Sequence, residues 1–333
     1  MSTGRPRILV IGVGSIGERH VRCFLATGRC EVAFCEPQPE LRQRVASQYP
    51  VAGSYANLDA ALPDDFHAAV ICTPAHLHAS LGLKAVLAGL HVLIEKPLAI
   101  SWDGVDDLAE AVAMRAVVAG VAYVYRSHPV LEAMKAALDS GRFGRPLQLV
   151  ATSGQHFPTY RPAYREIYYR SRTTGGGAVQ DALTHIVNAG EWLTGPVIEV
   201  VADAAHRALP GVDVEDTVNV IARHGAVLAS YSLNQHQAPN ESTITVVCER
   251  GTVRFEVHEN RWRWMTEPGQ AWHDEPGEPL ERDCLFTRQA NLFLDALQTH
   301  TSPPCSFADG LQTMRVNLAI LKSIESRAWQ VVV

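Results

Sequence analysis

Lys96 is a candidate to polarise a substrate oxygen, because of where the chain places it. An apolar run of strand length, residues 92–94, leads directly into Glu95, Lys96 and Pro97. Proline fixes its own φ and disfavours helical backbone at the residue before it. We therefore expect Lys96 in an extended or turn conformation at the carboxyl end of a strand, where open parallel α/β sheets bind their ligands.

A glycine-rich turn offers a second site. Residues 12–17 read Gly-Val-Gly-Ser-Ile-Gly, directly after an apolar run and before a helical pattern. In that context Gly12 makes a tight turn, Gly14 lets the backbone approach a pyrophosphate, and Gly17 allows close helix–strand packing. The flanking Val13, Ser15 and Ile16 belong to the same loop. The motif predicts that a dinucleotide binds at the amino end of the following helix.

Glu36 ends the second expected strand, about 20 residues past the glycine motif, where a carboxylate accepts hydrogen bonds from the adenosine ribose. The same carboxylate repels a 2′-phosphate, so we expect NAD rather than NADP. Arg42 and Arg44 fall in the next helix, where solvation is the simpler interpretation.

Residues 73–78 follow the third main strand and contain Thr73, Pro74, His76 and His78. Proline stops the strand, and Thr73 can offer its hydroxyl or its backbone to the cofactor. The two histidines resemble an H-x-H metal pair, but no third ligand is evident. Helix capping with cofactor contact is the simpler interpretation, and we expect no metal.

Asp181 and His185 form the second candidate pair. They follow a run of three glycines, residues 175–177, and are four residues apart in a helical pattern, so they share a helix face. A carboxylate beside an imidazole can orient it and support proton transfer. The alternative is a buried, satisfied histidine or an ordinary surface pair.

Residues 160–172 carry four tyrosines and four arginines in an otherwise acidic chain. The segment lies just before the glycine run, so we expect it to pass close to Asp181 and to select the substrate. Tyrosine offers a ring face to a sugar, and arginine a planar fork to a carboxylate or phosphate. The candidate substrate residues here are Tyr160, Arg161, Arg165 and Tyr168. Alternatively, these are solvated arginines and packing tyrosines at a subunit contact.

The elements that must position these residues fall into two patterns. Residues 7–121 alternate apolar strands with amphipathic helices, which predicts βαβ units and a parallel sheet. The expected strands are 7–13, 31–35, 68–72, 91–94 and 116–122. From 147 to 265 long alternating strands dominate, interrupted by one helix over 178–193, and residues 266–282 are expected to be a loop.

The predicted fold class is therefore α/β, with an N-terminal Rossmann dinucleotide-binding domain and a C-terminal α/β domain whose large, mostly antiparallel sheet has helices on one face. The expected boundaries are 1–125 for the Rossmann domain and 126–306 for a substrate and oligomerisation domain. The last segment, 307–333, is expected to form a helix that packs back on the domain interface.

Composition narrows the class of protein. The chain has 333 residues, 47% of them hydrophobic, and a formal net charge of −6, which gives no attraction to nucleic acid or to an anionic membrane. Seven cysteines without a C-x-x-C pair indicate free thiols in a reducing compartment, so we expect a cytoplasmic protein. Arg5 and Arg7 before an apolar run resemble a signal peptide, but that run breaks at once into glycines. No apolar stretch is long enough to span a bilayer.

Taken together, the chain resembles the Gfo/Idh/MocA family of NAD(P)-dependent sugar and cyclitol oxidoreductases. The matching residues, in order, are Gly12, Gly14, Gly17, Thr73, Pro74, His78, Glu95, Lys96, Pro97, Arg126, Pro129, Gly175, Gly176, Gly177, Asp181 and His185. The resemblance implies that Lys96, Asp181 and His185 match the family's catalytic lysine, aspartate and histidine. It also implies an open C-terminal sheet that is often used for oligomerisation, here into a dimer or tetramer.

The chain departs from the family pattern in two places. Val124, Tyr125, Arg126 and Ser127 stand where the family often has Asn-Arg-Arg-Phe, so only one arginine is left for the cofactor. Asn188 stands where an aspartate is often seen.

The expected activity is hydride transfer between NAD and a secondary hydroxyl or ketone of a sugar, sugar derivative or cyclitol, a CH–OH dehydrogenase of class EC 1.1.1. His185 is the expected base, Lys96 donates to the substrate oxygen as charge develops, and Asp181 orients His185 or binds another hydroxyl. Two alternatives stay open: an NAD-dependent glycosidase that uses transient oxidation, and a non-catalytic sensor that binds a dinucleotide.

Overall fold

The computed structural model describes residues 4–333, which form two compact units. The first unit holds the residues up to Ser127 together with Glu281–Gly310, and the second holds His128–Leu280 and Leu311–Val333. The sequence analysis placed residues 281–306 in the C-terminal domain. In the structure they join the first unit, because helix α9 (Cys284–Thr299) adds Ala290, Phe293 and Leu294 to that unit's hydrophobic core. Packing of the last helix at the domain interface stays a prediction.

The first unit is built on a parallel sheet in the strand order β3-β2-β1-β4-β5-β6. The strands are β1 (Arg7–Ile11), β2 (Glu31–Cys35), β3 (Gly53–Tyr55), β4 (Ala68–Ile71), β5 (His91–Ile94) and β6 (Ala119–Val121). Sequence patterning missed only β3, a three-residue edge strand with no buried residue. The Rossmann prediction is confirmed.

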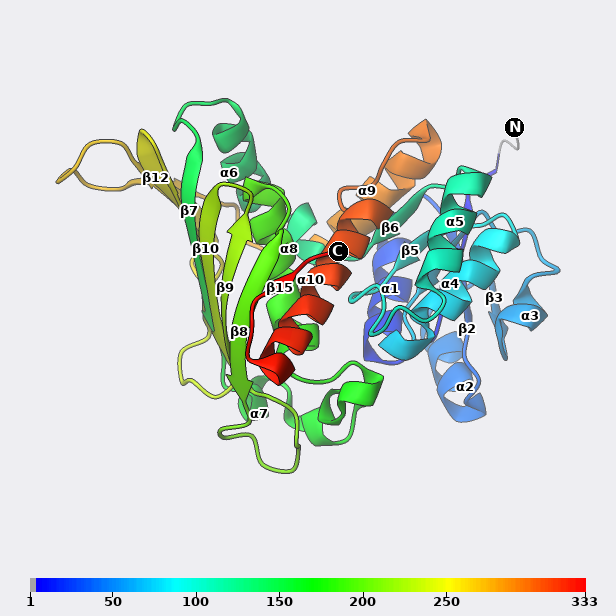
Figure 1. The fold of residues 1–333 in the computed structure, drawn as a ribbon. Helices are drawn as coiled ribbons and strands as arrows, with labels where there is room; N and C mark the ends of the chain where they lie inside the picture. The colour runs from blue at the N-terminus through cyan, green and yellow to red at the C-terminus, as the bar shows by residue number, and fades with distance from the viewer. Residues whose placement is uncertain (1–3) are drawn as a thin grey trace. The chain divides into compact units, whose positions relative to one another are not determined.

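Helices link these strands. They are α1 (Ser15–Ala26), α2 (Pro39–Gln48), α3 (Leu58–Ala61), α4 (His78–Leu87) and α5 (Val105–Arg115), with the 3-10 turns η1 (Ala75–Leu77) and η2 (Val124–Ser127). The helices seen in Figure 1 around this sheet bury apolar side chains such as Val21 and Phe24 of α1 and Val86 of α4. The loops after β1, β2, β4 and β5, at the carboxyl ends of these strands, hold Gly12, Glu36, Thr73 and Lys96 respectively.

The second unit is built on a nine-stranded sheet in the order β14-β13-β12-β11-β7-β10-β9-β8-β15. Only the β7–β10 pair is parallel. The strands are β7 (Pro146–Gly154), β8 (Glu199–Ala205), β9 (Thr217–His224), β10 (Val227–Asn234), β11 (Glu241–Cys248), β12 (Gly251–Glu256), β13 (Arg261–Met265), β14 (His273–Pro276) and β15 (Gln330–Val331). The expected large, mostly antiparallel sheet is confirmed.

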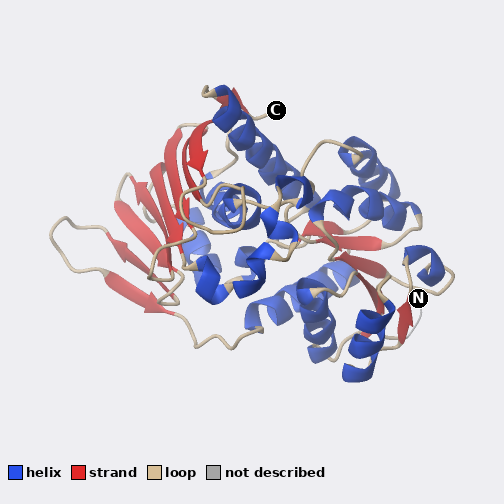
Figure 2. Cartoon of the chain, turned by 90° about the horizontal axis from the view of Figure 1, so that it is seen from below, coloured by secondary structure: helices blue, strands red, loops and turns tan. Residues whose placement is uncertain are grey.

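Buried and exposed residues alternate strictly along β9 and β10, as expected for a sheet with one covered face. The helices of this unit are α6 (Pro129–Asp139), α7 (Phe157–Tyr160), α8 (Thr184–Thr194) and α10 (Phe307–Ser326), which begins in the first unit. Figure 2 shows the helices of the unit on one side of its red strands. The opposite face of the sheet is open within this unit.

The Pro, Glu and Gly content of residues 266–282 predicted a loop, and this prediction is wrong for part of the segment. The segment contains β14, which pairs with β13. The pairing is specified across the strands, because His273 stacks on Trp264 with ring centroids 4.0 Å apart and Asp274 accepts a hydrogen bond from Arg263. Composition alone does not show such cross-strand contacts.

No helix among residues 4–333 is long and apolar enough to cross a membrane.

Candidate functional site

The glycine turn after β1 is shaped by close backbone packing. A Cβ atom on Gly17 would collide with the carbonyl oxygen of Gly12, so no larger residue fits there. Gly14 precedes the first turn of α1 and faces open space, and no side chain caps the helix at that position. The amino end of α1 is therefore open to an anion.

Glu36 is buried beside this turn. Its carboxylate accepts hydrogen bonds from the amide of Val13 at 3.1 Å and the amide of Gln38 at 3.0 Å. Glu36 therefore lies against the glycine turn, as the ribose-binding prediction requires. Arg42, expected to be solvated, instead donates to the carbonyl of Glu36 at 2.6 Å, while Arg44 pairs with Glu18 at 2.8 Å.

The loop after β4 carries Thr73, Pro74, His76 and His78. The Thr73 hydroxyl is buried and has no hydrogen-bond partner among the described residues, and His76 is exposed. His78 is only 1% exposed. Its Nδ1 lies 2.8 Å from the carbonyl oxygen of Pro97 and its Nε2 2.8 Å from that of Thr73. The His78 ring thus joins two loops.

Lys96 is half-buried directly after β5, where the sequence predicted it. Its amide donates to the carboxylate of Glu95 at 3.1 Å, and the other oxygen of that carboxylate lies 2.8 Å from Nε2 of His20. Burial opposes the charge of Glu95, but the hydrogen bond from His20 and the positive charge of Lys96 outweigh it and hold the pKa of Glu95 below its ordinary value.

Arg126 is buried in η2, and its guanidinium lies 3.6 Å from the carboxylate of Asp309. The residue is therefore partly neutralised within the first unit. A role for it in binding the nicotinamide stays a prediction.

Asp181 lies in η6 (Val179–Leu183), a π-helical turn, and His185 is the second residue of α8. The sequence predicted one continuous helix here, whereas the structure begins with the wider turn, a feature frequently found at functional sites. Asp181 is buried and accepts a hydrogen bond from the Tyr168 hydroxyl at 2.6 Å. His185 is half-buried.

Glu215 anchors the start of this helical segment. Its side chain accepts from the amide of Val179 at 3.2 Å and its carbonyl accepts from the amide of Ala178 at 2.9 Å. Gly177 has a φ of +95°, and a Cβ there would collide with the Glu215 carboxylate. The third glycine of the run is therefore required by this contact.

Segment 160–172 contains both packing and exposed residues. Tyr164 and Tyr169 are buried in a cluster with Phe157, Leu209, Val212 and Val214. Tyr160 and Tyr168 are 51% and 37% exposed. Arg165 donates to the Tyr164 hydroxyl, Arg161 lies over the Phe157 ring, and Arg172 pairs with Glu215 at 2.9 Å. The segment thus reaches Asp181 through Tyr168, and its arginines are exposed.

Two residues of these sites were missed in the sequence. His20 follows Gly17 by three residues on α1 and is only 1% exposed. Glu215 is 2% exposed and adjacent to the buried Asp216. A histidine one helical turn past the glycine motif is a signal that could have been used, whereas Glu215 is 36 residues from its partner Val179.

The first unit fits a dinucleotide. The open space at Gly14, the uncapped amino end of α1 and the unpartnered hydroxyl of Thr73 are features that a phosphate and a ribose would satisfy. No group of three or more His, Cys, Asp or Glu side chains among residues 4–333 is arranged to hold a metal ion.

Comparison with known proteins agrees with both units. A family model described as an oxidoreductase family with an NAD-binding Rossmann fold matches residues 6–123, and the GFO/IDH/MocA C-terminal domain matches residues 131–254. Levoglucosan dehydrogenase of Pseudarthrobacter phenanthrenivorans is 25% identical over 96% of this chain and 96% of its own length. Inositol 2-dehydrogenase of Pseudomonas syringae pv. syringae is 31% identical over 55% of this chain and 53% of its own.

Solved structures share the fold. A levoglucosan dehydrogenase in complex with NADH and levoglucosan has a TM-score of 0.89 at 24% identity, covering 99% of this chain and all of that one. The WlbA dehydrogenase of Bordetella pertussis, in complex with NADH and UDP-GlcNAcA, has a TM-score of 0.85 at 25% identity over 100% of this chain and 99% of that one. The two matched models cover more than half of the chain, and their ranges include the glycine turn, Lys96 and Asp181. The chain therefore belongs to the Gfo/Idh/MocA family of NAD-binding oxidoreductases.

Proposed function

We propose that this protein transfers a hydride between NAD and a secondary hydroxyl, or the corresponding ketone, of a sugar, sugar derivative or cyclitol. The observation that carries the proposal is the anchored Glu95–Lys96 pair at the end of β5, in the unit that matches the NAD-binding family model. The names of the relatives, levoglucosan dehydrogenase, inositol 2-dehydrogenase and 1,5-anhydro-D-fructose reductase, support the substrate class.

Each residue has a role in this proposal. NAD, when bound, takes up or supplies the hydride. The glycine turn and α1 hold its pyrophosphate, and Glu36 its adenosine ribose. Lys96 donates to the substrate oxygen as negative charge develops, and His185 accepts the hydroxyl proton. Asp181 binds a further hydroxyl or orients His185.

The substrate wall in this proposal is segment 160–172, together with Lys96, Asp181 and His185. The hydrogen bond from Tyr168 to Asp181 supports it, because a residue of the segment then touches a catalytic carboxylate. Tyr160, Tyr168, Arg161, Arg165 and Arg170 are exposed residues of this segment. This composition favours a substrate with an acidic or otherwise polar substituent over a plain hexose.

The test is a substrate panel followed by NADH absorbance. The panel contains levoglucosan, myo-inositol, 1,5-anhydro-D-glucitol, unmodified hexoses and their uronic acids, each with NAD and with NADP. We expect NADH to form with at least one, and Lys96→Met to lower the rate by roughly 10²–10³ with NADH affinity within a few-fold. Lys84→Met is the matched control, because the Lys84 side chain on α4 is 41% exposed and pairs with Asp59.

Two results would contradict the proposal. A Lys96→Met variant that keeps more than about a tenth of the rate removes this lysine from the mechanism. Release of the aglycone from a chromogenic glycoside, dependent on NAD but without net NADH, assigns a glycosidase instead.

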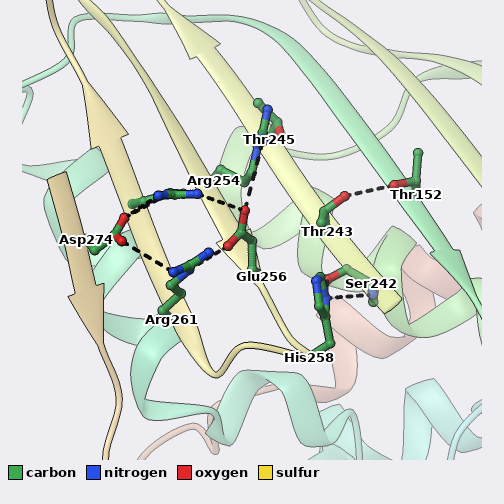
Figure 3. A network of polar contacts seen from close by, with 10 residues as sticks. Thr152, Ser242, Thr243, Thr245, Arg254, Glu256, His258, Arg261 and Asp274 are labelled. Carbon is green, nitrogen blue, oxygen red and sulfur yellow. Dashed lines mark hydrogen bonds and ion pairs between the residues drawn. The ribbon is translucent and has the colours of Figure 1, made fainter. Parts of the chain in front are cut away.

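The proposal includes a homodimer or homotetramer that covers the open face of the second sheet. Ile221 and Leu228 are 55% and 53% exposed on the strands β9 and β10. Further along the same sheet, on β12–β14, Arg261 pairs with Glu256 and Asp274, as Figure 3 shows. Arg263 pairs with the same two carboxylates. These four charges have partners within the chain, so a second copy that covers this part of the face does not have to supply them.

Light scattering at micromolar concentration checks the assembly. We expect a dimer or tetramer for the unmodified protein and a smaller species for Ile221→Glu with Leu228→Glu. The control is Met114→Glu, a 75% exposed residue of α5 in the first unit. A monomeric unmodified protein overturns the assembly.

A cytoplasmic location stays a prediction; the seven cysteines are free thiols in the structure.

A further inference from the structure

A buried histidine lies on each side of Lys96 along the main chain: His20 on the amino side and His78 on the carboxyl side. On the amino side, the Lys96 amide donates to one oxygen of Glu95 at 3.1 Å. The other oxygen of the same carboxylate accepts from Nε2 of His20 at 2.8 Å. His20 projects from α1, the helix that the glycine turn opens, so this contact ties the glycine-turn helix to the Lys96 loop.

On the carboxyl side, Nδ1 of His78 lies 2.8 Å from the carbonyl oxygen of Pro97, within hydrogen-bond distance. The same ring reaches the carbonyl of Thr73 through Nε2, also at 2.8 Å. Thr73 and Pro97 follow β4 and β5, which are neighbours in the parallel sheet. Both partners of His78 are carbonyl oxygens, which accept only from a ring N–H. Burial lowers the pKa of His78 and favours the neutral ring, which donates to one of the two carbonyls at a time.

Because the groups are buried, water cannot take the place of these hydrogen-bond partners. His20 and His78 are each 1% exposed and Glu95 is 5% exposed, so water does not replace a lost partner. The His20 ring is also packed between Phe24 and Phe286, with centroids 6.3 and 5.8 Å away. A buried carboxylate such as Glu95 stays charged only while it is paired, which fixes its orientation toward Lys96.

We propose that His20 and His78 are positioning residues for Lys96: His20 fixes the loop through the Glu95 carboxylate, and His78 fixes it through the Pro97 carbonyl. Neither histidine contacts the reacting atoms in this proposal. That the two histidines fix the Lys96 loop does not depend on the proposed function. That this helps hydride transfer does rest on the proposed function.

The scarcity of lysine makes the proposal directly measurable. The chain contains four lysines, Lys84, Lys96, Lys135 and Lys322, so 15N-lysine labelling gives four backbone amide signals. Lys96→Arg removes one of them and thereby assigns it. In the unmodified protein we expect the Lys96 amide proton far downfield and slow to exchange, because it donates to a carboxylate.

The variants separate the two histidines. His20→Leu and His78→Leu are each expected to move the Lys96 amide signal upfield and to speed its exchange at least about tenfold. His20→Gln restores the signal, because its amide N–H reaches the position of Nε2, whereas His20→Asn is too short and does not. His224→Leu is the control: His224 is a buried histidine of the second unit, and its loss leaves the Lys96 signal in place.

A Lys96 amide signal that stays unchanged in both leucine variants, with the other three lysine signals in native positions, overturns the proposal. If a leucine variant does not fold, the comparison of His20→Gln with His20→Asn decides, because equal Lys96 signals in these two variants contradict it.

The same samples distinguish a failure of the proposed function. Reductive 13C-methylation gives one side-chain signal per lysine, and added NADH is expected to shift that of Lys96 in the unmodified protein but not in His20→Leu. If the Lys96 amide responds to the histidine variants while its side-chain signal ignores bound NADH, the histidine contacts stand. The assignment of Lys96 to the reaction then fails.

Discussion

Glu36 shows how much one side chain decides at the residue scale. Its carboxylate is held by the amides of Val13 and Gln38, so it faces the glycine turn rather than solvent. Arg42 is already fixed on the Glu36 carbonyl. In the predicted ribose site, this carboxylate is the group that a 2′-phosphate would meet.

We expect Glu36→Ser with Pro37→Arg to move the cofactor preference from NAD toward NADP, because a repelling carboxylate is exchanged for a planar donor to phosphate. The measurement is the ratio of the dissociation constants of NADH and NADPH, from protein fluorescence. Arg44→Ser serves as the control, because Arg44 is engaged with Glu18. An unmodified protein that already prefers NADPH would show that Glu36 has another role.

At the scale of elements, α8 is fixed by a row of buried polar contacts to α10. Asn188 donates to the Thr313 hydroxyl at 2.9 Å, Thr313 donates to Glu191 at 2.6 Å, and Asn317 donates to Thr184 at 2.9 Å. These contacts align α8, which carries His185, with the last helix of the chain. They also explain Asn188, the departure from the family pattern, as a structural residue.

Thr313→Val keeps the shape of the side chain but removes its hydroxyl, which leaves the facing groups of Asn188 and Glu191 without that partner. We expect a loss of about 1–3 kcal/mol in the free energy of unfolding. Urea denaturation followed by circular dichroism measures it. The control is Thr299→Val on the exposed end of α9, which should change the stability by less than about 0.5 kcal/mol. Equal losses in the two variants would show that the α8–α10 contact adds no more to the stability than an exposed hydroxyl does.

The substrate segment is the other element open to test. Arg161, Arg165 and Arg170 are exposed, and we expect that replacing at least one of them by alanine raises KM or lowers kcat/KM about tenfold, near 1.4 kcal/mol. Arg170→Ala is the clearest of the three variants, because Arg165 also donates to the Tyr164 hydroxyl and Arg161 also lies over the Phe157 ring. The kinetics use whichever compound of the panel reacts fastest. Three unchanged variants would assign the segment to structure alone.

At the scale of the whole molecule, buried histidines make the stability depend on pH. Burial lowers the pKa of His128 to about 4 and that of His224 to about 4, from an ordinary value of 6.5. The unfolded chain therefore takes up protons that the native protein does not, and stability is lost as the pH falls from about 6.5 toward 4.

We expect the free energy of unfolding to fall between pH 7.5 and pH 5 by up to ~1.4 kcal/mol per pH unit for each of these histidines. His128→Phe is expected to reduce that slope, because His128 packs edge-on against Phe255 at 4.9 Å and a phenyl ring suits the same apolar site. Urea denaturation at several pH values measures both. An unchanged slope in this variant would show that His128 takes up no proton on unfolding.

The sequence by itself determined the parts of this protein that depend on local pattern. Alternating strands and helices, the glycine turn, the carboxylate after β2 and the proline after Lys96 each follow from nearest neighbours along the chain. They were sufficient for the two-sheet α/β fold, the cofactor and the family. Local backbone preference and hydrophobic period are encoded within a few residues, so they are legible without the fold.

Only the tertiary structure decided which side chains meet. Glu95 and His20 are 75 positions apart, and Val179 and Glu215 are 36 apart, yet both pairs share a buried hydrogen bond. The return of α9 to the first core and the pairing of β14 with β13 are of the same kind. Such contacts are selected by burial, where a polar group must find a partner from whatever segment lies beside it, and linear spacing carries no record of that choice.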